Sequence, residues 1–200
     1  TAVVSPTNMN ILYLEVDNPI KISVPGYTAG VISAVINNGK ISVIKKSLGE
    51  YSARPSKKGK AMVSLFTEVN GKRTKMGDME FRVKPVPPPK AELLGAKSVN
   101  GTTVIDKMMM VNAGGILARL KDFDFKGVRY MITSFRLTGV YKGEQMKEET
   151  KGPEFSLKMI NIIKNIKSGN TITISNIQAK RVDYKNSDEI PLDPLVIEIK

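Results

Sequence analysis

Apolar and polar residues alternate in short runs along the first 84 residues, and turn residues separate these runs. Ile20–Val24 and Met79–Val83 alternate strictly, which is typical of strands with one buried face. Asn37-Asn38-Gly39 and Asn70-Gly71 suit tight hairpin turns, because these residue types tolerate a positive φ. Six or seven short strands with regular turn signals predict an immunoglobulin-like β-sandwich over residues 1–84.

Residues 90–200 also have a β-rich pattern, together with one short helix. The longest strand run is Val128–Tyr141, for which we expect a bend and the usual alternation of faces. One face is expected to carry Val128, Tyr130, Ile132 and Ser134, and the other Met131, Thr133 and Phe135. The fold class is therefore mainly β, with two tandem β-rich domains.

The helix is expected at about residues 154–167. Its apolar residues recur at helical spacing and form one stripe; they are Phe155, Met159, Ile162, Ile163 and Ile166. Ser168-Gly169 follows as a helix end. A single helix of this kind covers the open side of a sheet, although docking on a membrane or on a partner is an alternative use of the stripe.

Pro85-Val86-Pro87-Pro88-Pro89 separates the two regions. Proline fixes φ and has no amide donor, so this run cannot lie inside a sheet or a helix. Residues 85–89 are therefore expected to form a semi-rigid extended linker between domains at 1–84 and 90–200.

The chain contains no Cys and no His. This removes the commonest transition-metal ligands and the imidazole base of nucleophilic active sites. Gly114-Gly115 indicates a turn or bulge and not a phosphate-binding loop, because no P-loop pattern surrounds it. We expect no enzymatic activity, no cofactor and no metal.

Asp122-Phe123-Asp124-Phe125 is the segment that most resembles a chemical site. In a strand, Asp122 and Asp124 would share one face, as a Ca²⁺ site or an acid–base pair could require. The alternative is an exposed polar edge opposite two buried phenylalanines, and the period-two pattern favours it. Hydrolase chemistry is the least supported function.

The net charge of +12 is spread along the chain, with clusters at Lys57-Lys58-Lys60 and at Lys72-Arg73-Lys75. Nucleic-acid binding would use such charge. However, only 6% of the residues are aromatic, which is poor for a base-stacking platform. Solvated loops or an acidic protein partner explain the charge better, so we expect no nucleic-acid partner.

The chain starts without an initiator Met or a signal peptide, and its longest apolar run, Val31–Ile36, is too short to span a bilayer. Either the whole protein is cytosolic, or the chain is an excised region of a longer protein whose targeting and anchoring segments lie upstream; the missing Met favours excision.

Several segments together carry a family resemblance. The most specific are Val16-Asp17-Asn18-Pro19-Ile20 followed by Val24-Pro25-Gly26, and Gly114-Gly115-Ile116 followed by Asp122–Phe125; the opening Ala2–Asn10 and Phe81–Lys84 with its proline linker add to them. The whole chain resembles the C-terminal periplasmic domains of the gliding-motility protein GldM and its type IX secretion counterpart PorM, from Bacteroidetes.

This resemblance implies a structural role. Members of the family have an N-terminal transmembrane helix in the inner membrane, which pairs with a second membrane protein to form a motor driven by the proton gradient. Their long dimeric periplasmic shaft reaches toward a ring complex at the outer membrane. The chain would then be a homodimeric, force-transmitting shaft segment in the periplasm, with the ring lipoproteins as partners.

The expected ring contact lies in the second domain, in the polar stretch Tyr141–Gly152. Its charged residues are candidate contacts, because loops on a rigid scaffold commonly bind partners; they are Lys142, Glu144, Lys147, Glu148 and Glu149. The alternative function is an extracellular or periplasmic ligand-binding module, such as a carbohydrate-binding β-sandwich. Such a module would need exposed Trp or Tyr, and the chain has no Trp.

Overall fold

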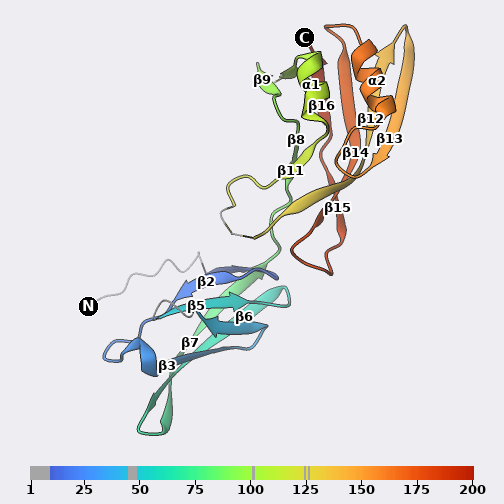
Figure 1. Cartoon of the computed structure of the whole chain (residues 1–200). Helices are drawn as coiled ribbons and strands as arrows, with labels where there is room; N and C mark the ends of the chain where they lie inside the picture. The colour runs from blue at the N-terminus through green and yellow to red at the C-terminus, as the bar shows by residue number, and fades with distance from the viewer. Residues whose placement is uncertain (1–9, 45–48, 101, 124, 126) are drawn as a thin grey trace. The chain divides into compact units, whose positions relative to one another are not determined.

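The computed structural model describes residues 10–44, 49–100, 102–123, 125 and 127–200, which form two compact units, residues 1–86 and 87–200 (Figure 1). The division falls inside the proline-rich run, where residues 85–89 belong to no helix or strand. Each unit contains its own sheets and its own hydrophobic core. The prediction of a mainly β chain is confirmed.

Among its described residues, the first unit contains seven strands and the 3₁₀ turn η2 (Ala29–Val31). The strands are β1 (Ile11–Tyr13), β2 (Asn18–Lys21), β3 (Ile32–Ile36), β4 (Lys40–Val43), β5 (Glu50–Arg54), β6 (Gly59–Val69) and β7 (Lys72–Lys84). They form a four-stranded sheet in the order β1-β7-β6-β3 and a three-stranded sheet in the order β2-β5-β4. All neighbours are antiparallel except β1 and β7, which are parallel.

The core of this unit lies between its two sheets. Alternate residues of β6 are buried, such as Ala61 and Val63, and on β5 Ala53 is buried between two less buried neighbours. The core cluster joins residues of both sheets: Leu12, Ile36, Ala53, Ala61, Val63 and Val83. The first unit is therefore the two-sheet sandwich that the alternation predicted.

The turn before β2 is held by a buried side chain. Asn18 is 2% exposed, and its amide donates to the carbonyl oxygens of Tyr13 (2.8 Å), Val16 (2.8 Å) and Ala53 (3.1 Å). Its Oδ1 accepts from the Tyr13 N–H at 2.7 Å. Since buried polar groups must be hydrogen-bonded, one asparagine here satisfies both the turn and the adjoining strand β5.

In the second unit, the described residues form nine strands and two α-helices. The strands are β8 (Lys90–Glu92), β9 (Lys97–Val99), β10 (Thr102–Ile105), β11 (Leu117–Arg119), β12 (Tyr130–Tyr141), β13 (Glu144–Lys151), β14 (Thr171–Arg181), β15 (Glu189–Leu192) and β16 (Leu195–Ile199). The helices are α1 (Lys107–Ala113) and α2 (Leu157–Asn165). The main sheet has the order β13-β12-β14-β16-β10-β9, with β15 also paired to β14, and β11 pairs with β8 separately.

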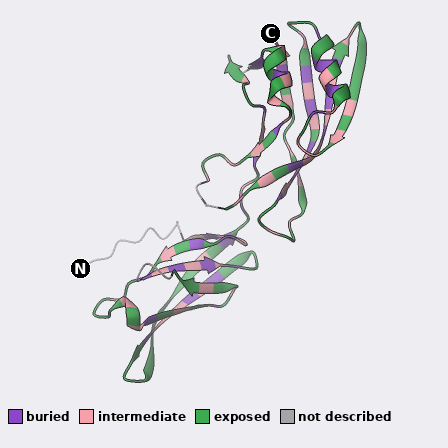
Figure 2. Ribbon diagram, viewed as in Figure 1, coloured by how far each residue is buried: buried purple, intermediate pink, exposed green. Residues whose placement is uncertain are grey.

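Both helices cover the same face of the main sheet, because they contact each other and share one core cluster with its strands. Figure 2 marks buried residues on both helices and on the central strands. The core contains side chains from both helices and from the central strands. Its largest fully buried members are Met110, Ile116, Ile132, Phe135, Leu137, Met159, Ile163, Ile166, Ile172, Ile174 and Ile177. Gly139 on β12 makes room for α2, since a Cβ there would lie 2.3 Å from the Cδ1 of Ile166.

The prediction of a single helix at about 154–167 needs two corrections. The helix is shorter, Leu157–Asn165, because Glu154 forms a β-bridge with Gly115 and the hydroxyl of Ser156 caps the first turn. The predicted stripe is nevertheless buried throughout.

The second correction is α1, which the sequence pattern did not reveal. Asp106 caps this helix by accepting from the N–H groups of Met108 and Met109, and Gly114 ends it with a φ of 71°. An Asp N-cap and a left-handed Gly end are standard helix signals. The run Met108–Met110 hid the helical period, because three consecutive apolar residues indicate no face.

Strand β12 departs from the predicted alternation. It begins at Tyr130, and its pairing with β14 shifts register twice between Ile132 and Arg136. Ile132 and Phe135 are consequently both buried, although strict alternation would place them on opposite faces. A bulge adds a residue to one strand and bends it, so the single unbroken alternation predicted across 128–135 is wrong.

The segment around Asp122 is not the predicted strand. Asp122 has a φ of 53° and lies in a bend, and Phe123 and Phe125 are only half-buried. Their rings stack on each other with centroids 4.8 Å apart. Asp124 lies outside the described residues, so the proposed carboxylate pair has no described geometry.

Candidate partner-contact surface

The stretch Tyr141–Gly152 was expected to be a charged loop, and this expectation is wrong. Strand β13 pairs with β12 from Tyr141↔Glu144 to Ser134↔Lys151. Only Lys142 and Gly143 lie between the strands, with φ values of 52° and 85°. Two consecutive positive φ angles are what the tightest hairpin turn requires.

The strand was missed because its sequence does not look like one. Glu144–Lys151 contains five charged residues and a single β-branched residue, Thr150, whereas strands are enriched in β-branched and aromatic residues. Charged residues are common on edge strands, where they prevent unwanted pairing. The Lys142-Gly143 pair, which follows an alternating run, was the available signal for a hairpin.

Strand β13 is the edge of the main sheet, and no strand of the described residues pairs with its outer side. Its side chains alternate between the two faces of the sheet. Glu148 lies opposite the buried Leu137, and its carboxylate is 3.9 Å from the Nζ of Lys158 on α2. This ion pair therefore links the edge strand β13 to helix α2.

The other face carries different members of the predicted set. Glu149 lies opposite Arg136 and forms an ion pair with its guanidinium, and Lys147 lies opposite Thr138. Lys142 is in the turn, with its Nζ 5.3 Å from the centre of the Tyr141 ring. The five candidate residues therefore do not form one surface: they are divided between two faces and a turn.

Two shallow hollows adjoin Glu149. One, of about 380 Å³, is lined by Arg136, Lys147, Glu148 and Glu149. The other, of about 470 Å³, lies at the bulge of β12 and is lined by Ser134, Phe135, Glu149, Thr150, Lys151, Asn176 and Gln178. Asn176 has a φ of 51° within β14, which fits the irregular pairing at this place.

The predicted linker is uneven in exposure. Pro85 and Pro88 are exposed, whereas Val86 and Pro89 are buried. None of the five residues joins a ladder, so their stiffness would come from the proline rings.

The two basic clusters of the first unit lie at opposite ends of the β6–β7 hairpin. Lys57-Lys58 precede β6, whereas Lys72 and Arg73 follow the turn after it. Arg73 lies over the ring of Phe66, 4.0 Å from its centre, and Lys75 pairs with Asp78 at 2.7 Å. The clusters therefore do not combine into one basic surface.

The shifted pKa values of the second unit have a structural explanation. The pKa of Asp183 is lowered: burial opposes this, but hydrogen bonds from the Arg181 side chain and the Arg129 N–H outweigh it. Arg181 is buried and pairs with this carboxylate. Burial raises the pKa of Tyr130 nearby. This cluster therefore holds the chain that follows β14.

In the first unit, two further groups have shifted pKa values. Burial raises the pKa of Tyr51, whose hydroxyl donates to the Ile32 carbonyl at 2.8 Å. Hydrogen bonds from Lys75 and Ser64 lower the pKa of Asp78. Within the described residues, no three His, Cys, Asp or Glu side chains are grouped as a metal site. No helix in that same part of the chain has the length and apolar character needed to cross a membrane.

The motifs that carried the family resemblance stabilise turns and connections in the structure. Asn18 holds the turn into β2, as described above. Gly115 lies so close to the chain before α2 that a Cβ would be 2.1 Å from the Pro153 carbonyl oxygen. The Ile116 N–H donates to that same oxygen at 2.9 Å, and the Phe155 N–H donates to the Gly114 carbonyl at 2.8 Å. These glycines join α1 to the segment that leads into α2.

Comparison with known families gives a consistent result over the whole chain. Residues 1–84 match the GldM third domain, and residues 85–200 match the GldM C-terminal domain. No curated protein matches the chain. Both units, in their order along the chain, therefore correspond to consecutive GldM domains, and the chain belongs to the GldM family of gliding motility and type IX secretion, a structural and not an enzymatic family.

Proposed function

We propose that the chain is a force-transmitting segment of a periplasmic shaft in the type IX secretion and gliding-motility motor. The observation that carries the proposal is the uninterrupted match of its two units to the third and C-terminal GldM domains. In the full-length protein, an N-terminal helix outside this chain would anchor the shaft in the inner membrane and pair with the motor partner. The second unit would then lie nearest the ring complex at the outer membrane.

The construction of the second unit suits the transmission of force. Strands β12 and β14 have 12 and 11 residues and are hydrogen-bonded along most of their length. Pulling such strands along their axes loads many hydrogen bonds at once, so the sheet should resist extension. The proline-rich linker would limit bending between the units.

Dimerisation is part of the proposal. Strand β3 is the edge of its sheet, and its residues Ile32–Ile36 carry no charge. An uncharged, apolar edge strand tends to aggregate unless it is covered. In a shaft made of two chains, a second copy would cover such edges. The isolated chain should therefore sediment as a homodimer, and a monomer at tens of micromolar would contradict this.

Contact with the ring complex is assigned to the second unit, including the β12–β13 hairpin. The test is co-purification of ring proteins with the whole chain and with residues 1–86 alone. Loss of the ring proteins from a shortened chain that still has its β circular-dichroism spectrum supports the assignment. Equal recovery of the ring proteins by residues 1–86 would refute it.

The alternative of a carbohydrate-binding module gains no support from the hollows. Stacking on a sugar requires an exposed aromatic side chain, and among the described residues Tyr27 is the only aromatic in the exposed class of large apolar side chains, at 41%. It lines none of the hollows described above. Phe135, which lines the largest hollow near β13, is 2% exposed.

A further inference from the structure

The solvent face of the two helices exposes large apolar side chains. Leu157, at the start of α2, is 85% exposed, and Met108 and Met109 on α1 are 54% and 48% exposed. The opposite sides of the same helices are fully buried at Met110 and Met159. The helices therefore pack on the sheet through other residues, and these exposed side chains are not part of the core.

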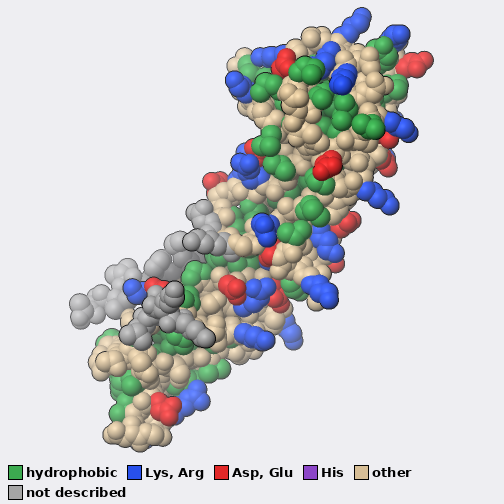
Figure 3. Space-filling model, viewed as in Figure 1, with side chains coloured by type: hydrophobic (Ala, Val, Ile, Leu, Met, Phe, Trp, Pro, Cys, Tyr) green, Lys and Arg blue, Asp and Glu red, His purple; other side chains and the backbone are tan. Residues whose placement is uncertain are grey.

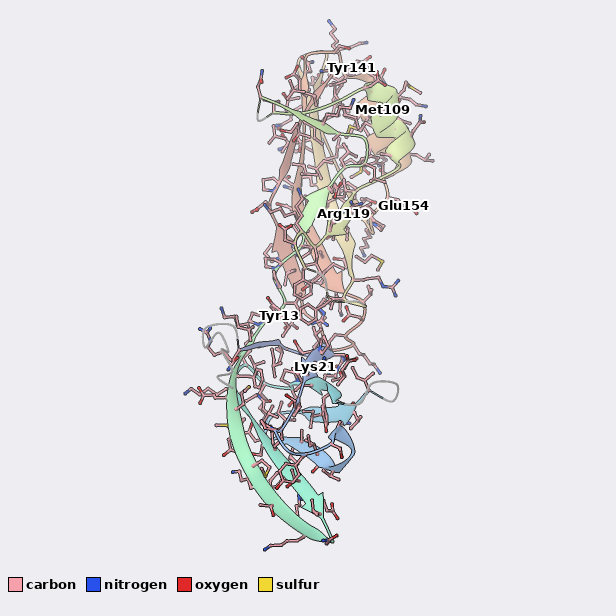
Figure 4. All side chains as sticks on the ribbon, turned by 90° about the vertical axis from the view of Figure 1, so that its left-hand side faces the viewer. Tyr13, Lys21, Met109, Arg119, Tyr141 and Glu154 are labelled. Atoms are coloured by element: carbon pink, nitrogen blue, oxygen red, sulfur yellow. The ribbon has the colours of Figure 1, made fainter. Side chains whose placement is uncertain are left out.

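These side chains belong to one side of the unit. Both helices pack on the same sheet face and contact each other, and the Gly115–Glu154 bridge joins the end of α1 to the segment before α2. Leu94, 45% exposed, precedes Gly95, and a Cβ at Gly95 would lie 3.3 Å from the Met109 methyl group. We call Leu94, Met108, Met109 and Leu157 the helix patch; Figure 4 labels Met109 on α1.

The charged residues on the helices are all basic. Lys107 lies on α1, and Lys158 and Lys164 lie on α2; neither helix contains Asp or Glu. Two carboxylates beside the helices are engaged, because Asp106 caps α1 and Glu148 pairs with Lys158. The exposed Glu154 lies three residues before α2, and the three lysines outnumber it. Figure 3 shows hydrophobic side chains together with Lys or Arg, and some Asp or Glu, on the part of the surface where the helices lie.

We propose that the helix patch is a docking surface for an apolar, acidic segment of a partner protein. Exposed apolar side chains beside polar or charged ones mark interaction sites, and methionine adapts its shape to a partner. The lysines would attract Glu and Asp flanking the partner's apolar residues and would set the encounter rate and specificity. The inference rests on the proposed function in taking this partner to be a ring component.

Other occupants fit less well. A second copy placed symmetrically on the patch would bring lysine against lysine, which is repulsive. Helices that bind the membrane interface generally carry Trp or Phe on their apolar face, whereas α1 and α2 contain no aromatic residue. The charge of the patch therefore distinguishes an acidic protein segment from both.

The test uses the whole 200-residue protein and a synthetic helical peptide as the probe. The peptide has Leu at positions i, i+3, i+4 and i+7 and Glu or Ala elsewhere, a pattern that docks in apolar grooves. A second peptide has Lys in place of Glu. Binding is measured by fluorescence anisotropy at low and high salt, and anionic phosphatidylglycerol vesicles provide a separate arm.

Two double variants alter the patch. Met109→Ser with Leu157→Ser removes apolar surface, and Lys158→Glu with Lys164→Glu reverses the charge. The apolar control is Val196→Ser: Val196 is 54% exposed and precedes the buried Ile197 in β16, so it lies on the sheet face that points away from the helices. The charge control is Lys185→Glu, at an exposed residue in the segment after β14. All these side chains are exposed, so each variant should fold.

The Leu/Glu peptide should bind the wild type, and both patch variants should weaken this binding at least tenfold while the controls leave it unchanged. Higher salt should weaken binding to the wild type and have little effect on the charge-reversal variant. The inference is overturned if the peptide does not bind, if the Leu/Lys peptide binds equally well, or if only vesicles bind.

The same variants are then measured against the purified ring complex. Ring binding that the patch variants reduce supports both proposals. Ring binding that is equal for the wild type and the patch variants overturns the patch and leaves the shaft function standing. If the peptide binds through the patch but the chain does not bind the ring complex, the patch is a docking surface and the assignment of the ring as its partner is wrong.

Discussion

Replacing Asn18 by Ala should destabilise the first unit substantially and leave the second unit unchanged. The side chain is 2% exposed and makes four hydrogen bonds, of which three are donated by one NH₂ group and one is accepted from Tyr13. Because the NH₂ group has only two protons for its three acceptors, the four contacts of the Asn18 side chain amount to about three full hydrogen bonds. At about 1 kcal/mol net for each bond, the loss is about 3 kcal/mol.

This loss would be a large part of the stability of a small domain, which is about 5–15 kcal/mol. For a domain of this size, about 3 kcal/mol lowers the melting temperature by roughly 12–24 °C. The substitution destabilises the unit by more than about 3 kcal/mol if water does not reach the Ala53 carbonyl that loses its partner, because a buried unsatisfied group costs about 1–3 kcal/mol.

The measurement is amide hydrogen exchange of the whole chain at increasing urea, followed by mass spectrometry of peptides from each unit. Peptides covering β5 should lose protection at lower urea in Asn18→Ala, whereas peptides covering β14 should not change. The matched control is Asn38→Ala, because Asn38 also bonds backbone groups, including the Lys57 carbonyl at 2.8 Å, but at an exposed site. A loss below about 1 kcal/mol, or equal losses in the two variants, would refute the reasoning about burial.

Three further predictions concern other parts of the chain. Gly115→Ala should loosen the start of α2, because its Cβ would lie 2.1 Å from the Pro153 carbonyl oxygen, and faster hydrogen exchange of the Phe155 amide would show this. The control is Gly143→Ala, which places a Cβ at a turn where nothing lies near it, so that it tests backbone strain without a clash. Asp183→Asn should flatten the acid side of the stability profile: the folded-state pKa is lowered, so its stabilisation is present above the unfolded value of about 3.9 and is lost as the pH falls through the folded pKa. The urea midpoint of the wild type should therefore exceed that of the variant at neutral pH and approach it in acid, and a difference between the two midpoints that does not shrink on acidification would contradict this. Replacing Pro87, Pro88 and Pro89 by Gly should broaden the X-ray scattering distribution of distances between the units without unfolding either one; identical curves would show that the prolines do not stiffen the linker.

The sequence by itself determined the class of each unit, where local patterns and burial agree. Ile20–Val24 and residues 79–83 alternate because one side of each segment faces a core, and the sandwich follows from several such segments. The stripe Phe155, Met159, Ile162, Ile163 and Ile166 was identified for the same reason, and all five are buried. The Val16–Ile20 motif was recognisable as a family feature, although only the structure shows that Asn18 bonds a strand 35 residues away.

Tertiary structure decided the features that depend on neighbours distant in sequence. Glu144–Lys151 is a strand because β12 supplies its hydrogen-bond partners, not because of its own residues. The bulges in β12 turn Ile132 and Phe135 toward one core, because the strand must match β14 and the helices at once. Met108 and Met109 differ from Met110 only in which side of α1 meets the sheet, and a run of three methionines carries no such information. Burial against distant elements, and not local preference, therefore determined the candidate docking surface.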